Sequence, residues 1–269
     1  MATTAWEPRQ NSTPEEENQV SATLPARSGP GSYRTTARAV GVVYLVGMVV
    51  GVVGDILIQS ILSAPDHLSM VSVSSMILGI GAMLWLIAVA GDTAHGVLMY
   101  PILKQHNERI AVGYLASRIL DSVFVAIMVL FVLLQIPLGS EYLKAGASDT
   151  FDLQALSTVF MQAKLYAYHV GMTALGFAGL MLCYLFYRAK LVPGLVSIWG
   201  LVGYATILGG SVLEVLGLDL RLIHVIPGGL WELFIGVWLI AKGFSSSGIA
   251  PAPAAASRES GSYSGSQEA

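Results

Sequence analysis

The chain is poor in charged residues and in cysteine. Only 12% of its 269 residues are Asp, Glu, Lys or Arg, against roughly a quarter in a soluble domain, so most of its surface is not suited to contact with water. A net charge of −3 excludes the broad positive field that binds nucleic acid. The single cysteine, Cys183, excludes an internal disulfide, and no Cys/His cluster has zinc-ligand spacing.

Sequence motifs for nucleotide binding and hydrolysis are also missing. The chain has no G-x-x-x-x-G-K-[ST], no G-x-S-x-G and no G-x-G-x-x-G after a strand. It has no H-E-x-x-H, no two histidines four residues apart, and nothing that points to haem. We therefore expect no catalytic residues, no metal and no cofactor, and an enzyme is not the favoured interpretation.

Long apolar stretches dominate what is present. A helix needs about 20 mostly apolar residues to cross a bilayer, and continuous runs of that length are not the alternating strands of a membrane barrel. The stretches are residues 37–62, 73–103, 110–138, 159–187, 195–218 and 222–244. They predict an all-α polytopic membrane protein, a bundle of six transmembrane helices, with the lipid bilayer as its first partner.

The two ends of the chain differ from this apolar part. Residues 1–35 are rich in Ser, Thr, Pro and Glu and lack the apolar core of a signal peptide, and residues 245–269 are rich in Ala, Pro, Ser and Gly. We expect both to be disordered tails around a transmembrane domain at 36–244. The basic residues gather in alternate connections: Arg27, Arg34, Arg38, Lys104, Arg109, Arg188, Lys190 and Lys242. The positive-inside rule then places both ends in the cytoplasm.

Ionisable and polar residues inside the apolar stretches are the candidate functional residues. Each charge in the middle of a bilayer costs about 2.5–3.5 kcal/mol on insertion scales, so such residues must face the bundle interior, pair or become neutral. Counting roughly 1.5 Å per residue along each helix separates two layers. The inner polar cluster is Asp92, His95, Arg118, Asp121 and Glu232. The outer polar cluster is Asp55, Gln59, His169 and Glu214, with His224 at similar depth and Lys164 and Arg221 near the rim.

The spacing of these residues leaves several interpretations open. Arg118 and Asp121 are three residues apart and can pair along their own helix, as can Asp92 and His95. Glu232 is either a partner of Arg118 or a site for a proton or ligand. The function is then a small permease or proton-coupled transporter for a small-molecule ligand, a non-catalytic sensor or accessory component with a membrane protein partner, or an intramembrane enzyme using Asp55, His169 and Glu214.

Several short segments resemble one protein family. These are LMYPILK at 98–104, ASRILD at 116–121, LFYRAKLVP at 185–193 and, most specifically, WELFIGVWLIAKGF at 231–244. With the arginine-flanked first span, they make residues 34–244 similar to DUF4386, a family of uncharacterised bacterial membrane proteins. The resemblance implies six helices and a bacterial cytoplasmic membrane, and it implies no particular activity.

Overall fold

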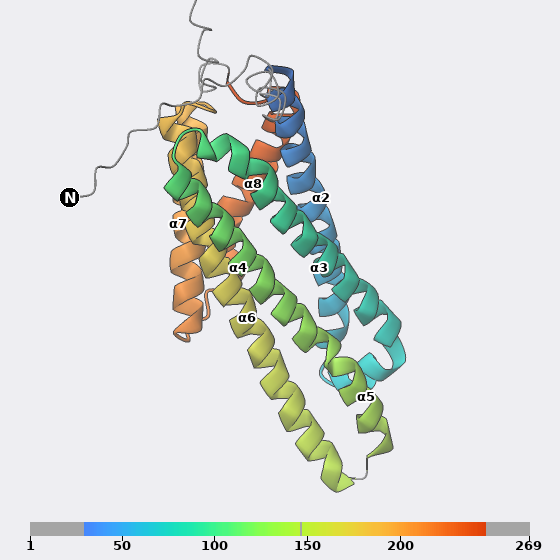
Figure 1. Cartoon of the computed structure of the whole chain (residues 1–269). Helices are drawn as coiled ribbons and strands as arrows, with labels where there is room; N and C mark the ends of the chain where they lie inside the picture. Colours follow the sequence, from blue (N-terminus) through green and yellow to red (C-terminus); the bar gives the residue numbers. More distant parts are fainter. Residues whose placement is uncertain (1–29, 146, 246–269) are drawn as a thin grey trace, which may run out of the picture.

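The computed structural model describes residues 30–145 and 147–245, and within these ranges it consists of helices and short connections without a β-strand. The predicted tails lie almost entirely outside the described residues. The elements are α2 (Pro30–Leu62), α3 (His67–Lys104), α4 (Glu108–Leu133), α5 (Gln135–Lys144), α6 (Ala147–Arg188), α7 (Gly194–Val215), the short 3-10 helix η1 (Arg221–Val225) and α8 (Ile226–Ala241) (Figure 1).

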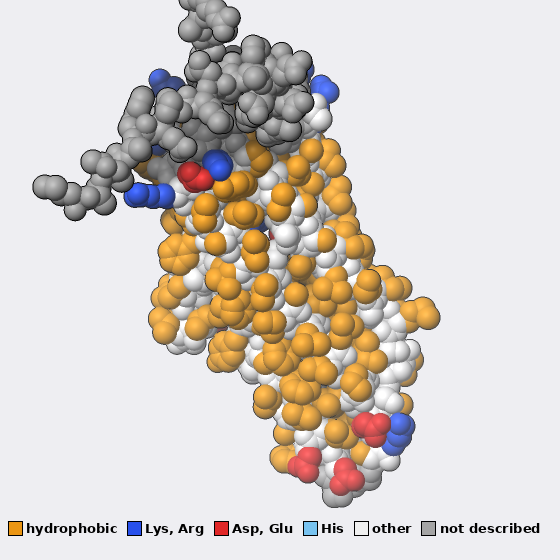
Figure 2. Space-filling view, in the orientation of Figure 1, with side chains coloured by type: hydrophobic (Ala, Val, Ile, Leu, Met, Phe, Trp, Pro, Cys, Tyr) orange, Lys and Arg blue, Asp and Glu red, His pale blue; other side chains and the backbone are white. Residues whose placement is uncertain are grey.

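Six of the described helical segments are long and apolar enough to cross a membrane, which confirms the predicted fold class. The third span is α4 continued by α5. Exposed apolar side chains cover most of the face of the bundle that Figure 2 shows, and charged side chains on this face gather at its two ends. The chain is therefore a multi-pass membrane protein.

The helix ends differ from the sequence prediction. Helix α2 begins at Pro30, so residues 30–35 belong to a helix and not to the tail to which we assigned them. Helix α6 begins at Ala147 and has 42 residues, about 63 Å at the rise of an α-helix and about twice the hydrocarbon thickness. Its first turns extend with α5 beyond the rest of the bundle (Figure 1). The difference arises because hydropathy marks where a helix meets water, whereas its backbone hydrogen bonds continue past that point.

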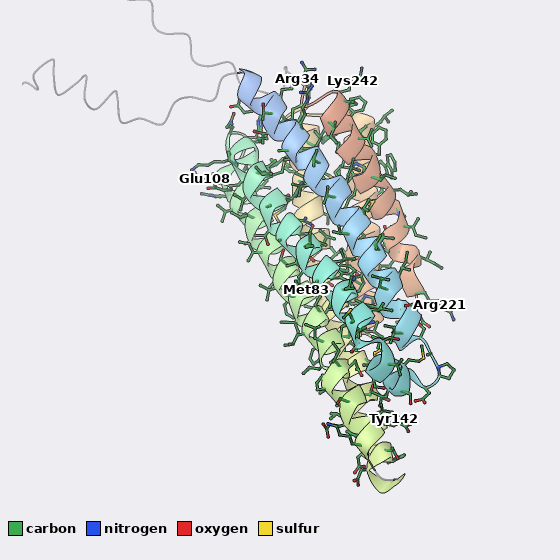
Figure 3. The ribbon with its side chains drawn as sticks, turned by 90° about the vertical axis from the view of Figure 1, so that its right-hand side faces the viewer. Arg34, Met83, Glu108, Tyr142, Arg221 and Lys242 are labelled. Atoms are coloured by element: carbon green, nitrogen blue, oxygen red, sulfur yellow. The ribbon has the colours of Figure 1, made fainter. Side chains whose placement is uncertain are left out.

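The six spans form a closed ring in chain order. Each spanning helix packs against the next one, from α2 to α3, α4, α6, α7 and α8, and α8 packs against α2. Figure 3 shows α2 lying between α3 and α8. Polar side chains on the inner faces of different helices can therefore meet inside the ring without facing lipid.

Several pairs of helices approach so closely that only glycine fits between their backbones, and two of these contacts serve as examples. A Cβ added to Gly81 on α3 would lie 2.9 Å from the carbonyl oxygen of Gly54 on α2. A Cβ added to Gly203 on α7 would lie 2.9 Å from the Cα of Gly228 on α8. Such small-residue contacts are the usual way in which helices associate in lipid.

The two ends of the bundle carry different connections. Arg34, Glu108 and Lys242 lie at one end, and Tyr142 and Arg221 lie at the other (Figure 3). The described chain thus enters and leaves at the same end of the bundle, as six spans require.

Candidate functional site

The centre of the inner cluster is an ion pair between neighbouring helices. Nη2 of Arg118 on α4 lies 2.6 Å from Oδ1 of Asp92 on α3. Nη1 of the same guanidinium lies 3.7 Å from Oδ2 of Asp121, one turn further along α4. The side chains of Arg118 and Asp121 are 4% and 0% exposed, so these two side chains are removed from lipid and from bulk water.

Asp92 differs from its partners because its side chain is 39% exposed. On α3 it shares a face with the buried residues Ala88, Gly96 and Met99, opposite Ile87 and Val97 on the lipid side. Its carboxylate is therefore directed toward the other helices.

A histidine and two tyrosines extend the cluster across the ring. The hydroxyl of Tyr114, one turn before Arg118, lies 2.7 Å from Nδ1 of His95. The ring of Tyr44 on α2 packs on the imidazole of His95 with centroids 4.2 Å apart. Nε2 of His95 is buried and has no hydrogen-bond partner within the described chain. The buried imidazole is thus held by one hydrogen bond and by ring contacts with Tyr44 and Tyr114.

Glu232 joins the cluster from α8. The hydroxyl of Tyr204 on α7 donates to Oε1 of Glu232 at 2.7 Å, and it lies 3.4 Å from the hydroxyl of Tyr44. Glu232 also interacts electrostatically with Arg118 and Asp92. All five residues predicted for the inner cluster therefore belong to one network, to which α2, α3, α4, α7 and α8 contribute.

The charges of this network do not balance. It holds the carboxyl groups of Asp92, Asp121 and Glu232 and one guanidinium, that of Arg118. An uncompensated charge in a low-dielectric interior is strongly unfavourable. Both oxygens of Asp121 are buried and accept no hydrogen bond from the described residues. One guanidinium can neutralise only one of the three acids. The cluster is thus suited to bind protons or a cationic group that neutralises the other two.

The predicted outer cluster divides into two parts. Nε2 of His169 on α6 lies 3.9 Å from Oε2 of Glu214 on α7, and the other oxygen of Glu214 accepts the Leu220 backbone N–H at 2.8 Å. The ring of His224 packs 5.9 Å from that of His169.

The second part of the outer cluster lies on α2. Gln59 donates to Asp55 on its own helix at 3.5 Å, and the buried Lys164 on α6 interacts electrostatically with Asp55. No hydrogen bond or ion pair between described residues joins Asp55 to His169 or Glu214. Residues 30–145 and 147–245 also contain no group of three His, Cys, Asp or Glu side chains placed to hold a metal ion.

The residues that the sequence predicts for the inner cluster do not include its tyrosines. Tyr114 and Tyr204 are each 1% exposed, and their hydroxyls bind the histidine and the glutamate of the cluster. Tyr114 could have been found by its position one turn before Arg118, on the same face of α4. A second missed feature is a hydrogen-bonded set at the far end of the bundle, in which Ser157 lies 2.7 Å from both His67 and Gln135.

Comparison with known proteins gives a family and no activity. The family model described as "Domain of unknown function (DUF4386)" matches residues 39–243. No curated protein and no solved structure matches the chain.

Proposed function

Because the chain belongs to the DUF4386 family, a domain of unknown function, we propose its activity from the inner cluster: it is a small permease that couples the movement of a solute to protons. The observation that carries this proposal is the excess of acids in the ring. Three carboxyl groups share one guanidinium, and the side chain of one of these acids, Asp92, is 39% exposed. Ionisable residues that face the interior of a transmembrane bundle are the groups that proton relays in membrane proteins use.

The contacts of the cluster supply a route for coupling. Asp92 is held by Arg118 on one side of the ring, and Glu232 is held by Tyr204 on the other. A proton bound by one acid changes the electrostatic energy of the second, because the two carboxyl groups interact. A solute that enters the ring and neutralises one of them would therefore be linked to proton release or uptake by the other.

We further infer that the end carrying Arg34 and Lys242 faces the cytoplasm of a bacterial cell. Lys104 ends α3, Arg188 ends α6 and Lys190 lies in the connection after α6, all at that same end. This asymmetry in basic residues is the feature that orients membrane helices during insertion.

The proposal can be tested without knowing the solute. The full chain is reconstituted in proteoliposomes on a solid-supported membrane, and a pH jump is applied while the displaced charge is recorded. We expect a transient current with the native protein that Glu232→Gln and Asp92→Asn reduce severalfold. Tyr204→Phe, which keeps the acid and removes its hydrogen bond, should shift the pH at which the current appears.

The matched control is Glu141→Gln. Glu141 is an exposed acid at the far end of the bundle, 3.0 Å from Lys144, and its loss should leave the current unchanged. A native protein that gives no more current than empty liposomes would contradict proton coupling. If that protein also co-purifies with a second membrane protein, an accessory role becomes the better account.

A further inference from the structure

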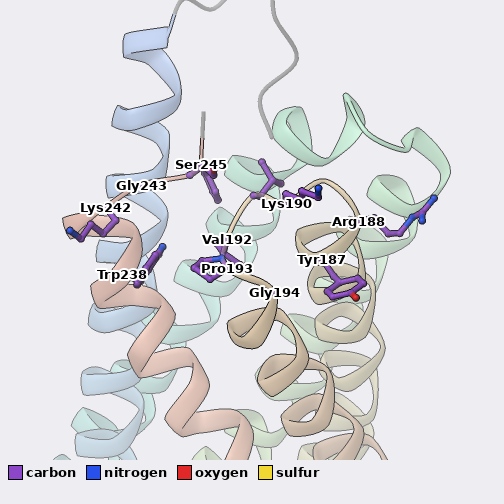
Figure 4. A pocket seen from close by; sticks show the side chains of 12 residues that line it. Tyr187, Arg188, Lys190, Val192, Pro193, Gly194, Trp238, Lys242, Gly243 and Ser245 are labelled. Atoms are coloured by element: carbon purple, nitrogen blue, oxygen red, sulfur yellow. The ribbon is translucent and has the colours of Figure 1, made fainter. Parts of the chain in front are cut away.

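A cavity of about 660 Å³ lies where α6 and α8 end and α7 begins. Three of its lining residues are basic, namely Arg188 at the end of α6, Lys190 in the following connection and Lys242 after α8. Among the described residues that line it, none is acidic. Figure 4 shows Lys242 and Trp238 on one side of the start of α7, Tyr187 and Arg188 on the other, and Lys190 in the connection between them. The cavity therefore has a positive rim.

These basic side chains are exposed, and none of them forms an ion pair within residues 30–145 and 147–245. Lys104, at the same end of the bundle, is instead neutralised by Glu108 at 3.0 Å. Within the part of the chain that the structure describes, the positive charge at the cavity is thus not neutralised.

The backbone holds the three basic residues around one opening. The N–H of Ser245 donates to the carbonyl oxygen of Leu191 at 2.9 Å, which ties the segment after α8 to the connection between α6 and α7. Lys190 has a φ of 53°, which is uncommon for a residue other than glycine, and the N–H of the next residue, Leu191, donates to the carbonyl oxygen of Phe186 at 3.1 Å. The connection that carries Lys190 is therefore tied both to the end of α6 and to the segment after α8.

The surroundings of the cavity are apolar as well as basic. Leu195 and Tyr187 are 82% and 50% exposed, and Trp199, one turn after Leu195 on α7, is 37% exposed. Trp238 lines the cavity itself. Tryptophan and tyrosine concentrate at the boundary between hydrocarbon and headgroups, so the aromatic lining of the cavity is of the kind found at that depth.

We propose that this cavity binds the phosphate-bearing headgroup of an anionic membrane lipid. The headgroup phosphate lies among Arg188, Lys190 and Lys242, and an acyl chain runs along the exposed side of α7 past Leu195. Basic pockets between spanning helices are suited to anionic headgroups in this way. Free phosphate could also bind the three basic side chains, but it has no acyl chain to pack against the exposed apolar face of α7.

The experiment measures binding of phosphatidylglycerol to the full chain in detergent by native mass spectrometry, with phosphatidylcholine as the reference lipid. We expect the native protein to retain more phosphatidylglycerol than phosphatidylcholine. In Lys190→Gln/Lys242→Gln the affinity should fall by about fivefold for each basic residue removed. The matched control, Arg38→Gln/Arg109→Gln, removes two exposed basic residues at the same end but outside the cavity, and it should change the affinity less than twofold.

Two outcomes would overturn the proposal. Equal losses in the two double variants would mean that lipid responds to diffuse charge and not to this cavity. Inorganic phosphate that binds the native protein but not Lys190→Gln/Lys242→Gln, without any preference for phosphatidylglycerol over phosphatidylcholine, would assign the cavity to a soluble anion. Melting temperatures of all variants are recorded alongside, and Arg188→Gln serves as a second cavity variant if the double variant is unstable. None of these readouts depends on proton transport.

Discussion

Arg118 contacts the carboxylate of Asp92 on the neighbouring helix at 2.6 Å, a shorter distance than the 3.7 Å to Asp121 on its own helix. The ion pair therefore joins α3 to α4 in addition to the apolar packing between them. It also determines which acid is neutralised, since one guanidinium cannot compensate Asp92 and Asp121 together.

Loss of Arg118 should destabilise the bundle strongly. Arg118→Gln leaves two acids near one another without a cation, and breaking one side of a buried pair costs about 3–5 kcal/mol. We expect a clear fall in the melting temperature of the detergent-purified protein. Arg109→Gln is the control, because Arg109 is an exposed residue in the first turn of the same helix. Equal melting temperatures for the two variants would contradict a structural role for the ion pair.

Asp121→Asn should be tolerated far better than Arg118→Gln. Asp121 has the longer contact with Arg118, and its oxygens accept no hydrogen bond from the described chain. Replacing the carboxyl group by an amide of the same shape removes one excess acid, so we expect a change in the free energy of unfolding within about 1 kcal/mol. Thermal unfolding measures it, and a loss as large as that of Arg118→Gln would show that an ionised Asp121 is required.

The contact between α7 and α8 should not tolerate a side chain. In Gly203→Ala the added methyl group would lie 2.9 Å from the Cα of Gly228, and overpacking of this kind costs about 1–3 kcal/mol. Gly209→Ala, on the same helix, meets nothing within 4 Å, and removing a glycine from a helix interior stabilises it by roughly 0.5–1 kcal/mol. The two variants should thus shift the melting temperature in opposite directions.

The orientation of the bundle can be measured with introduced cysteines. The native Cys183 is buried, so the unmodified chain should react little with a membrane-impermeant maleimide and is its own control. Gln105→Cys lies between α3 and α4, and Asp66→Cys lies between α2 and α3. We expect intact cells to label Asp66→Cys and inverted vesicles to label Gln105→Cys. The reverse pattern would contradict the positive-inside orientation.

Part of the candidate site could be predicted from single residues. Asp92, Arg118 and Glu232 stand out because a charged residue in an apolar stretch must be hidden from lipid, and the structure places them in one network. Their partners could not be predicted this way. Helical side chains lean toward the amino-terminal end of their helix, so Arg118 extends away from Asp121, and the identity of its neighbour depends on how α3 and α4 are aligned.

In the outer cluster, too, the sequence predicted which residues are candidates but not which of them are in contact. Depth along each helix grouped Asp55 with His169 and Glu214, but depth says nothing of the position around the ring. Asp55 accepts a hydrogen bond from Gln59 and interacts electrostatically with Lys164, whereas His169 lies 3.9 Å from Glu214 and packs against His224.

The amino-acid sequence alone determined the solvent of this protein and the number of its spans, because hydrophobicity is a property of each residue that adds up along the chain. It also determined which side chains had to be hidden. Only the tertiary structure decided that Arg118 pairs with Asp92, that tyrosines hold His95 and Glu232, and that the six spans close into a ring. These features depend on the rotation and axial alignment of one helix against another, which arise from contacts between residues distant in the chain.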